Sequence, residues 1–292
     1  MGNLVFISGD FSSGTTLAFT LLRQTEDCHC LYEPLHERLL HWLVWSPRPY
    51  DGHAFVGDYV REYKGFSAIP QLFDPAWGVS GLHLAADADA PGLFRYLSYL
   101  IGTAYARERN VVLKENRITF RLDWLRANFP QAKILHVWRD VDAQWASVVR
   151  RVQEHLQRAD VGQDSVDFMG FRLAAWCDDL APTFPELARD ASSTGYERFS
   201  KLWELSRREH ERHADVSVEL ADLKTDFEGT CRRISADIGF ELDAVRLRPY
   251  LSTGKRQAPH NGAHQRLERA VDGLGQRYAE IRVRRRARTG DG

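Results

Sequence analysis

An apolar run followed at once by a glycine-bounded turn constrains the fold of this chain more than any other feature. Residues 4–8 are apolar and predict a buried strand, and residues 17–22 predict an apolar helix. The turn between them, residues 9–14, has the form G-x-x-x-x-G and is followed by Thr15 and Thr16. A strand, such a turn and a helix direct backbone N–H groups and a helix N-terminus toward one point, where a phosphate binds. The stretch therefore predicts an anion-binding loop.

The loop lacks the lysine that nucleoside triphosphate-binding loops carry. In G-x-x-x-x-G-K-[ST] the lysine binds the β- and γ-phosphates, and the hydroxyl group binds Mg²⁺. Thr15 occupies the lysine position here, so the loop predicts a nucleotide held by its 5′-phosphate group without triphosphate chemistry. Glycine, serine and threonine also form ordinary turns and helix caps, and the loop alone leaves that alternative open.

The composition excludes several classes of partner. The chain has 292 residues and a formal net charge of -1, so no overall attraction to nucleic acid or to an anionic membrane is expected. No charged segment with an apolar core precedes the first strand, and no apolar run approaches the length of a membrane span. We therefore expect a cytoplasmic protein with no membrane span and no nucleic-acid partner.

The cysteines and histidines predict no metal site. The four cysteines, at positions 28, 30, 177 and 231, are too few and too scattered for a disulfide framework. Cys28-His29-Cys30 would alternate between the two faces of a strand, and no second pair has zinc spacing, so core cysteines are expected. His210 and His213 lie one helical turn apart and could bind a metal, but the run around them is highly charged. We expect both on a solvated helix face.

Charged residues follow three further apolar runs. Strands are predicted at residues 28–33, 111–113, 133–138 and 216–220. The first run ends at Glu33, the second is followed by Lys114, and the third by Arg139. Ligands of an open parallel α/β sheet bind at the carboxyl ends of the strands, so these side chains are expected on the same edge as the loop.

The rest of the chain predicts helices around this sheet. Residues 38–105 are aromatic and rich in turn signals, and predict a largely helical insertion that forms the acceptor-side surface, although ordinary packing of short helices gives the same pattern. Residues 160–213 are predicted to be helical with two breaks, and residues 226–238 form a helix that Gly239 ends. The basic tail at residues 282–292 is expected to be a flexible, solvated end. With no repeat or linker, one domain over residues 1–292 is expected.

Two segments together resemble the sulfotransferases that use 3′-phosphoadenosine 5′-phosphosulfate (PAPS). Residues 9–16 resemble the family motif G-x-x-[RK]-S-G-[TS]-[TS]. Residues 129–140 with Ser147 resemble F-P-x-A-[KR], a strand, R-D-P and a serine eight residues after the arginine. Residues 113–117 and 220–223 are similar to the L-K-[ST]-P-R and Y-E-D-L elements. The resemblance implies a three-layer α/β fold of the P-loop type, with a central, mostly parallel sheet flanked by helices.

The resemblance also implies a site for each phosphate of PAPS, and no required metal. The residues implied for the 5′-phosphosulfate are Ser12, Ser13, Gly14, Thr15 and Thr16. Those for the 3′-phosphate are Arg139 and Ser147, with Thr253, Gly254, Lys255 and Arg256 added on their charge and on a similar late loop in relatives. Two phosphates on opposite sides of one adenosine need two separate anion sites, which agrees with this division.

The loop departs from the family pattern at one position. Ser12 stands where the family carries Arg or Lys, a cation that would stabilise charge on the departing phosphate. Lys114, or the pair Lys255 and Arg256, is expected to replace it, or the activity is low. Val141 replaces the proline of R-D-P and changes only the entry to a helix.

Sulfuryl transfer requires a base that takes the proton of the acceptor. Glu33 is expected in this role, because carbohydrate-acting members of the family place a glutamate at a comparable point. His36 is the rival base, and Glu33 as a structural partner of Lys114 stays open.

The predicted reaction moves the sulfuryl group of PAPS to a hydroxyl or amine group of a small-molecule, sugar or lipid acceptor and releases PAP. The alternatives are a P-loop kinase of small molecules and a non-catalytic PAP-binding protein. The sequence determines neither the acceptor nor the oligomeric state.

Overall fold

The computed structural model describes residues 2–45, 59–155, 167–168, 171–189 and 194–252. These residues belong to one compact unit, Met1–Gly254. Residues 255–292 form a second unit that lies outside the described residues, as do Thr253 and Gly254. The expectation of one domain over the whole chain therefore stays a prediction.

A five-stranded sheet forms the centre of the described unit. Its strands, in the order in which they pair, are β2 (Cys28–Tyr32), β3 (Asn110–Lys114), β1 (Leu4–Ser8), β4 (Ala132–Trp138) and β7 (Val216–Glu219). Every pair in this sheet is parallel. The register places Lys114 opposite both Ile7 and Tyr32, and His136 opposite Ser8, so the carboxyl ends of the central strands meet at one edge. The predicted parallel α/β sheet is confirmed.

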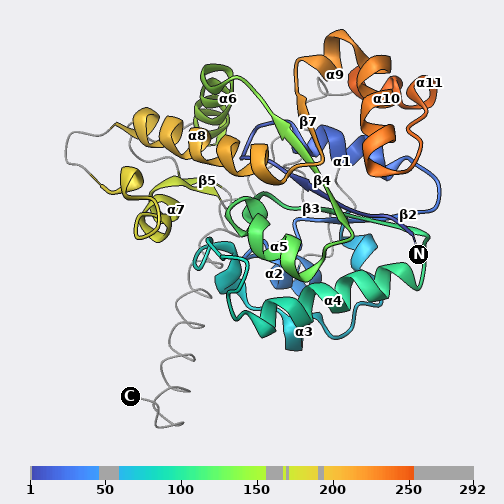
Figure 1. Ribbon diagram of the computed structural model, residues 1–292, viewed down its shortest axis with the longest axis horizontal. Helices are drawn as coiled ribbons and strands as arrows, with labels where there is room; N and C mark the ends of the chain where they lie inside the picture. Colours follow the sequence, from blue (N-terminus) through green and yellow to red (C-terminus); the bar gives the residue numbers. More distant parts are fainter. Residues whose placement is uncertain (1, 46–58, 156–166, 169–170, 190–193, 253–292) are drawn as a thin grey trace. The chain divides into compact units, whose positions relative to one another are not determined.

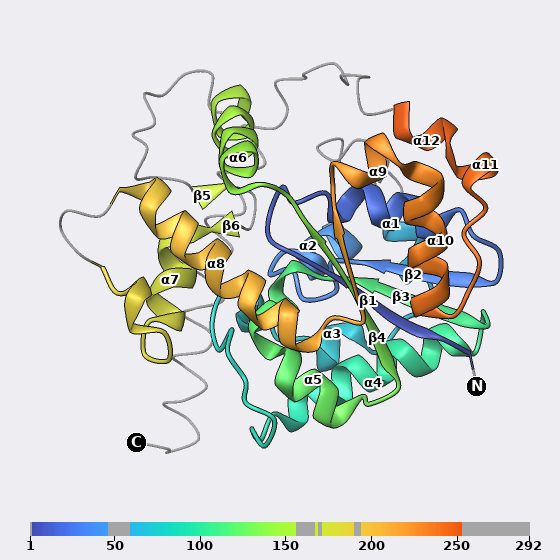
Figure 2. The ribbon, with the colours of Figure 1, turned by 45° about the horizontal axis from the view of Figure 1, so that its top comes forward.

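Helices cover both faces of the sheet (Figure 1 and Figure 2). On one face lie α1 (Thr15–Arg23) and α10 (Phe227–Ile238), and on the other lie α4 (Pro91–Tyr105) and α5 (Leu122–Asn128). The long helix α8 (Gly195–His213) packs against α5. This gives the expected three layers. At the end of α10, Gly239 has a φ of 83° and caps the helix as the sequence predicts.

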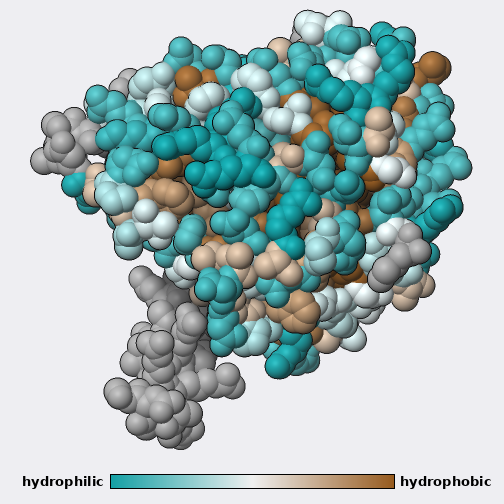
Figure 3. All heavy atoms as spheres, viewed as in Figure 1, coloured by the Kyte–Doolittle hydropathy of each residue, from teal (hydrophilic) through white to brown (hydrophobic). Residues whose placement is uncertain are grey.

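The strands are apolar on both faces because helices bury both faces of the sheet. All five residues of β1 are buried, with Leu4, Val5, Phe6 and Ile7 at most 1 % exposed, as is typical of a parallel sheet between two helical layers. A second apolar cluster packs Phe11 of the loop against Trp176 and Phe199. It joins the loop to α6 (Val141–His155), α7 (Leu173–Leu180) and α8. Hydrophilic side chains cover most of the face that Figure 3 shows.

The described part of the 38–105 insertion is helical, as expected. It contains α2 (Leu39–Trp45), the 3₁₀ helix η1 (Tyr59–Tyr63), α3 (Ile69–Leu72), the 3₁₀ helix η2 (Pro75–Gly78) and α4. Tyr63, Phe66 and Phe73 are buried, and the ring centroids of Phe73 and Tyr96 lie 5.6 Å apart. Several of these aromatic residues therefore pack the core of the insertion.

Two differences from the expected helices are local. Residues 167–172 were predicted to be helical but contain the antiparallel pair β5 (Asp167–Phe168) and β6 (Phe171–Arg172). Phe168 and Phe171 have high strand propensity, and the two intervening residues match the length of a tight hairpin. The segment before α5 is the 3₁₀ helix η3 (Asn116–Arg121). The remaining short helices are η4 (Pro185–Leu187), α9 (Asp222–Thr225), α11 (Ala244–Leu247) and α12 (Pro249–Ser252).

Within the described ranges, every helix is too short or too polar to cross a bilayer.

Candidate active site

The loop between β1 and α1 is shaped by two glycines that no larger residue can replace without displacement. A Cβ at Gly9 would lie 2.2 Å from the carbonyl oxygen of Val137. Gly14 has a φ of 111°, and its Cβ would lie 2.6 Å from Cδ1 of Leu220. Inside the loop, the N–H of Ser13 donates to the carbonyl oxygen of Asp10 at 3.1 Å. The backbone therefore turns tightly and approaches both β4 and the end of β7.

Two serine hydroxyl groups of the loop are buried without a hydrogen-bond partner among the described residues. They belong to Ser12, whose φ is 66°, and to Ser13, which is 1 % exposed. The next two hydroxyl groups are paired: Thr15 Oγ1 donates to Asn116 at 3.3 Å, and Thr16 Oγ1 lies 3.1 Å from the hydroxyl of Tyr32. The first N–H groups of α1 have no partner within the helix. Unpaired hydroxyl and N–H donors at one point fit the oxygens of a phosphate or phosphosulfate group.

A hollow of about 340 Å³ adjoins this loop. Arg139 and Asp140 line it from the end of β4, and Lys224 lines it from α9. Leu220, which a side chain at Gly14 would strike, also lines the hollow, so loop and hollow are neighbours. The indole N–H of Trp203 donates to the carbonyl oxygen of Arg139 at 3.1 Å and fixes its backbone. The structure thus places Arg139 beside the loop, as expected.

The other residues expected at the 3′-phosphate fall into two groups. Ser147 is buried on α6, two turns after Arg139, and does not line the hollow. The late-loop residues Thr253, Gly254, Lys255 and Arg256, and the basic tail at residues 282–292, lie outside the described residues. Lys224 was missed, because a lone lysine in the short helix α9 gives no signal in the sequence.

Glu33 lies directly after β2, in a left-handed conformation with a φ of 45°. Its N–H donates to the carbonyl oxygen of Lys114 at 2.7 Å, which continues the strand pairing past Tyr32. Its carboxylate forms an ion pair with the ammonium of Lys114, and Arg117 Nη1 lies 3.3 Å from Oε2. Burial lowers the pKa of Lys114, although the charge of Glu33 opposes this change. Glu33 and Lys114 are therefore brought together at the expected edge, in a site that is nearly closed to water.

His36 lies between two carboxylates. Its Nε2 is 3.8 Å from Oε2 of Glu33, and its Nδ1 is 3.3 Å from Oε2 of Glu37. Arg117 Nη2 donates to the same Glu37 oxygen at 3.0 Å. Burial would raise the pKa of Glu37, but the charges of His36 and Arg117 outweigh it and hold this pKa at about 2. Glu37 is thus ionised, and the backbone N–H of Arg38 donates to Nδ1 of His36 at 3.1 Å.

The segment after β3 supplies further charged groups that sequence reasoning did not assign. Glu115 accepts the N–H groups of Leu35 at 2.7 Å and Arg117 at 2.9 Å, and burial raises its pKa. Arg121 donates to backbone carbonyl oxygens, including those of Gly81 and Trp77. The run Lys114-Glu115-Asn116-Arg117 resembles a segment of the sulfotransferases. Its charged residues were the signal in the sequence that could have indicated a charged cluster here.

A second buried network lies under the loop and corrects one expectation. His210 was expected on a solvated face but is 1 % exposed. Its Nε2 lies 2.9 Å from Oγ of Ser8, and its ring stacks on His136 with centroids 3.8 Å apart. The helical run around His210 is charged, but this residue lies on the face of α8 that contacts the sheet. Burial lowers the pKa of His210 to about 3.

Asp10 completes this network within the loop itself. Removal of its carboxyl group from water raises its pKa to about 7, although Ser206 and Arg207 oppose the change. At neutral pH a large fraction of Asp10 is therefore uncharged. This protonation reduces the repulsion that a carboxylate in the loop would exert on a bound anion.

The loop, the hollow and the charged cluster form one continuous site at the carboxyl edge of the sheet. Thr15 bonds to Asn116 and Thr16 to Tyr32, and these partners are neighbours of Glu115 and Glu33. The fold and site therefore define an α/β protein with a nucleotide-type loop, an adjacent hollow lined by Arg139 and Lys224 together with Asp140 and Glu219, and a buried cluster of charged residues.

The family model of the sulfotransferase family matches residues 5–244, so the chain belongs to that family. The resemblance of the loop and of the Arg139 segment to sulfotransferases is thereby confirmed.

Curated relatives include the omega-hydroxy-beta-dihydromenaquinone-9 sulfotransferase Stf3 of Mycobacterium bovis and of Mycobacterium tuberculosis. Each is 29 % identical over 290 residues, which cover 85 % of this chain and 66 % of the relative. The chain thus spans just under two thirds of the length of these relatives. Among solved structures, sulfotransferase STF9 from Mycobacterium avium matches with a TM-score of 0.47 and 14 % identity, over 88 % of this chain and 69 % of that one.

Proposed function

We propose that the protein transfers the sulfuryl group of PAPS to a hydroxyl group of an apolar, lipid-like acceptor and releases PAP. The observation that carries this proposal is the pair of buried, unpartnered hydroxyl groups at Ser12 and Ser13 beside the hollow that Arg139 lines. These are two neighbouring but separate places for anionic groups, as a nucleotide with both a 5′- and a 3′-phosphate requires. Membership of the sulfotransferase family supports the choice of PAPS among such nucleotides.

The donor residues follow from this arrangement. Ser12, Ser13 and the first turn of α1 would bind the 5′-phosphosulfate, and Arg139 would bind the 3′-phosphate with Lys224 on the same hollow. PAPS, when bound, supplies a sulfuryl group on a phosphate leaving group. Ser12 carries no charge and cannot neutralise charge on the leaving phosphate. Among the residues around Glu33, Lys114 is the cation that would do so.

Glu33 is the proposed base. It would take the proton of the acceptor hydroxyl group as the oxygen–sulfur bond forms and the bond from sulfur to the phosphate breaks. Lys114 and Arg117 contact the carboxylate and orient it. His36 is the alternative base, because its Nε2 lies 3.8 Å from the same carboxylate.

The acceptor side of the site is apolar. The helix α2 begins three residues after His36 and has the sequence Leu-Leu-His-Trp-Leu-Val-Trp. Trp42 packs on His36 with ring centroids 4.2 Å apart, whereas Val44 is 59 % exposed. An apolar helix beside the proposed base favours a hydroxylated hydrocarbon over a sugar. The name of the Stf3 relatives gives a hydroxylated menaquinone as their acceptor, which agrees with a hydroxylated hydrocarbon.

A binding panel and a transfer assay test the proposal. The full chain is titrated with PAP, 5′-AMP and ATP with Mg²⁺, and then incubated with PAPS carrying radioactive sulfur and with hydroxylated lipids, phenols or sugars. We expect PAP to bind most tightly and the label to move to a lipid alcohol. Tight binding of ATP with Mg²⁺ and no label transfer would favour the kinase, and PAP binding without any transfer would favour a non-catalytic protein.

A further inference from the structure

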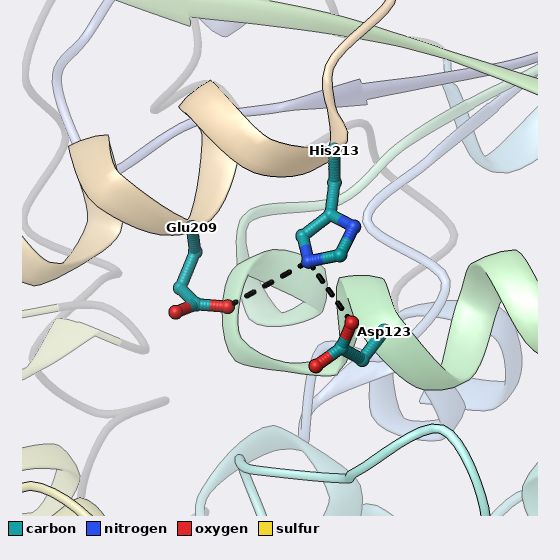
Figure 4. Close-up of side chains that lie close together, drawn as sticks. All are labelled: Asp123, Glu209 and His213. Atoms are coloured by element: carbon teal, nitrogen blue, oxygen red, sulfur yellow. Dashed lines mark ion pairs between the residues drawn. The ribbon is translucent and has the colours of Figure 1, made fainter.

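Three side chains at the contact of α5 and α8 point toward one another, away from the proposed active site. They are Asp123 from the first turn of α5, and Glu209 and His213 from the last turns of α8 (Figure 4). The Nε2 atom of His213 lies 3.1 Å from Oδ1 of Asp123 and 4.0 Å from Oε2 of Glu209. One oxygen from each carboxylate and this nitrogen all lie within 4.8 Å of one another.

We propose that Asp123, Glu209 and His213 bind a zinc ion, with water as the fourth ligand. In a tetrahedral site with bonds of about 2.0–2.2 Å, ligand atoms lie about 3.4 Å apart. The distances of 3.1 and 4.0 Å from Nε2 lie on either side of that value. One imidazole with two carboxylates favours zinc, because magnesium and calcium take oxygen ligands almost exclusively.

The His213 nitrogen is oriented for an ion rather than for a direct hydrogen bond. Its Nε2 is buried and has no hydrogen bond among the described residues, although a carboxylate oxygen lies 3.1 Å away. The side chain of His213 is only 14 % exposed, so little water reaches the ring. A buried ring nitrogen that points between two carboxylates without bonding to either has the arrangement that a shared cation requires.

The surroundings also favour a cation. Arg212 holds the other oxygen of Glu209, Oε1, at 3.1 Å, so Oε2 is left directed at His213. The helix α8 ends at His213, whose carbonyl oxygen accepts hydrogen bonds from the guanidinium of Arg126, so only the side chains of the cluster are left to bind an ion. A zinc ion would neutralise both carboxylates, whereas a proton on His213 would neutralise only one. Zinc and this proton therefore compete for the same nitrogen.

The site would fix a helix that holds the anion loop. His210, one turn before His213, contacts Ser8 at the end of β1 from the same helix. An ion between α5 and α8 therefore stabilises the end of α8 on which this contact depends. This proposal concerns stability and does not rest on the proposed transfer reaction.

The test is zinc binding by the full chain after removal of metal with a chelator. ZnCl₂ is titrated by calorimetry into the wild type and into the variants His213→Gln and Asp123→Asn. Matched controls are His83→Gln and Asp222→Asn, which change the same residue types outside the cluster. We expect one zinc per chain to be lost, or its affinity to fall at least tenfold, in the two cluster variants only. At a hundredfold excess over the Kd, zinc should raise the Tm of the wild type by about 4 °C.

Cobalt distinguishes this site from binding to thiols. Cys28 and Cys30 have sulfur atoms 3.6 Å apart and are the obvious competing site. Cobalt bound there gives a thiolate charge-transfer band, whereas cobalt at a site of one nitrogen and two carboxylates does not. We therefore expect cobalt to bind without that band, and we expect His213→Gln to abolish this binding.

Two results would overturn the proposal. One is that both cluster variants bind zinc with the affinity and stoichiometry of the wild type. The other is that the wild type binds no zinc, in which case the cluster is an ion pair between a protonated His213 and the carboxylates. Asp123 has a side chain that is 48 % exposed, so Asp123→Asn is expected to fold. Circular dichroism of each variant before titration checks this point.

Discussion

The contact between Gly14 and Leu220 allows the loop geometry to be tested apart from its chemistry. In Gly14→Ala, the residue keeps a φ of 111°, and its Cβ meets Cδ1 of Leu220 at 2.6 Å. The left-handed conformation costs about 1–2 kcal/mol. The overpacking costs a further 1–3 kcal/mol, roughly, so the free energy of unfolding should fall by about 2–5 kcal/mol.

Gly81 provides the matched control for the backbone cost alone. Its φ is 59°, and a Cβ there would meet no atom within 4 Å. Gly81→Ala should therefore lower the free energy of unfolding by only about 1–2 kcal/mol. In a Leu220→Ala background the obstruction is gone, so Gly14→Ala should cost no more than Gly81→Ala. The coupling in this double-mutant cycle should be about 1–3 kcal/mol.

Urea unfolding measures the stabilities, and calorimetry measures the affinity for PAP. We expect Gly14→Ala to bind PAP at least tenfold more weakly, because the shifted loop misplaces the Ser12 and Ser13 hydroxyl groups, while Gly81→Ala stays within twofold of the wild type. Equal destabilisation by the two alanines, or no coupling to Leu220, would refute the reasoning about the contact. Unchanged PAP binding in Gly14→Ala would refute the assignment of the loop.

Three further predictions concern charged groups. Glu33→Gln should abolish sulfuryl transfer and retain PAP binding, and near-wild-type turnover would remove Glu33 from the mechanism. The Tm of this variant should also fall, because Lys114 loses its buried counter-charge. Arg139→Ala should weaken binding of PAP by at least tenfold and that of 5′-AMP much less, as calorimetry with both nucleotides would show; equal losses would contradict a 3′-phosphate role. Burial raises the pKa of Asp10 from 3.8 to about 7, so the folded state binds the proton of this carboxyl group more tightly than the unfolded state does. The contribution of Asp10 to the free energy of unfolding should therefore fall as pH rises from about 4 to 7. Asp10→Asn should remove at most about 4 kcal/mol of that pH dependence, and identical urea-unfolding profiles for both proteins would show that Asp10 is not buried in this way.

The positions of the strands along the chain and of the loop could be predicted because their signals are local. The residues of β1 are apolar at successive positions, and a glycine-bounded turn follows at its end. Glu33, Lys114 and Arg139 could be placed on one edge because parallel strands align their carboxyl ends. That inference required no knowledge of any individual contact.

The pairing of Glu33 with Lys114 was one of the alternatives that the sequence left open. The other partners in the site could not be predicted, because they come from distant parts of the chain. Glu37 and Arg117 are 80 positions apart in the sequence, and only the fold brings them into an ion pair. His210 looked solvated because its neighbours in sequence are charged, yet its contact with Ser8 joins residues 202 positions apart. Burial of a single polar side chain depends on which face of a helix meets the sheet, and charge composition does not determine that face.

The helix α8 shows why the site depends on elements that carry none of its chemistry. Three of its residues reach the edge of the sheet at successive turns: Trp203 binds the carbonyl group of Arg139, Ser206 lowers the pKa of Asp10, and His210 contacts Ser8. One helix thus sets the position of the anion loop relative to the hollow that Arg139 lines. The proposed nucleotide would occupy both places. Its start is fixed by a capping box of Thr194 and Glu197, and its end contacts α5 through His213 and Asp123. A change at either end should therefore move both anion sites together, whereas a change at Arg139 itself affects only one.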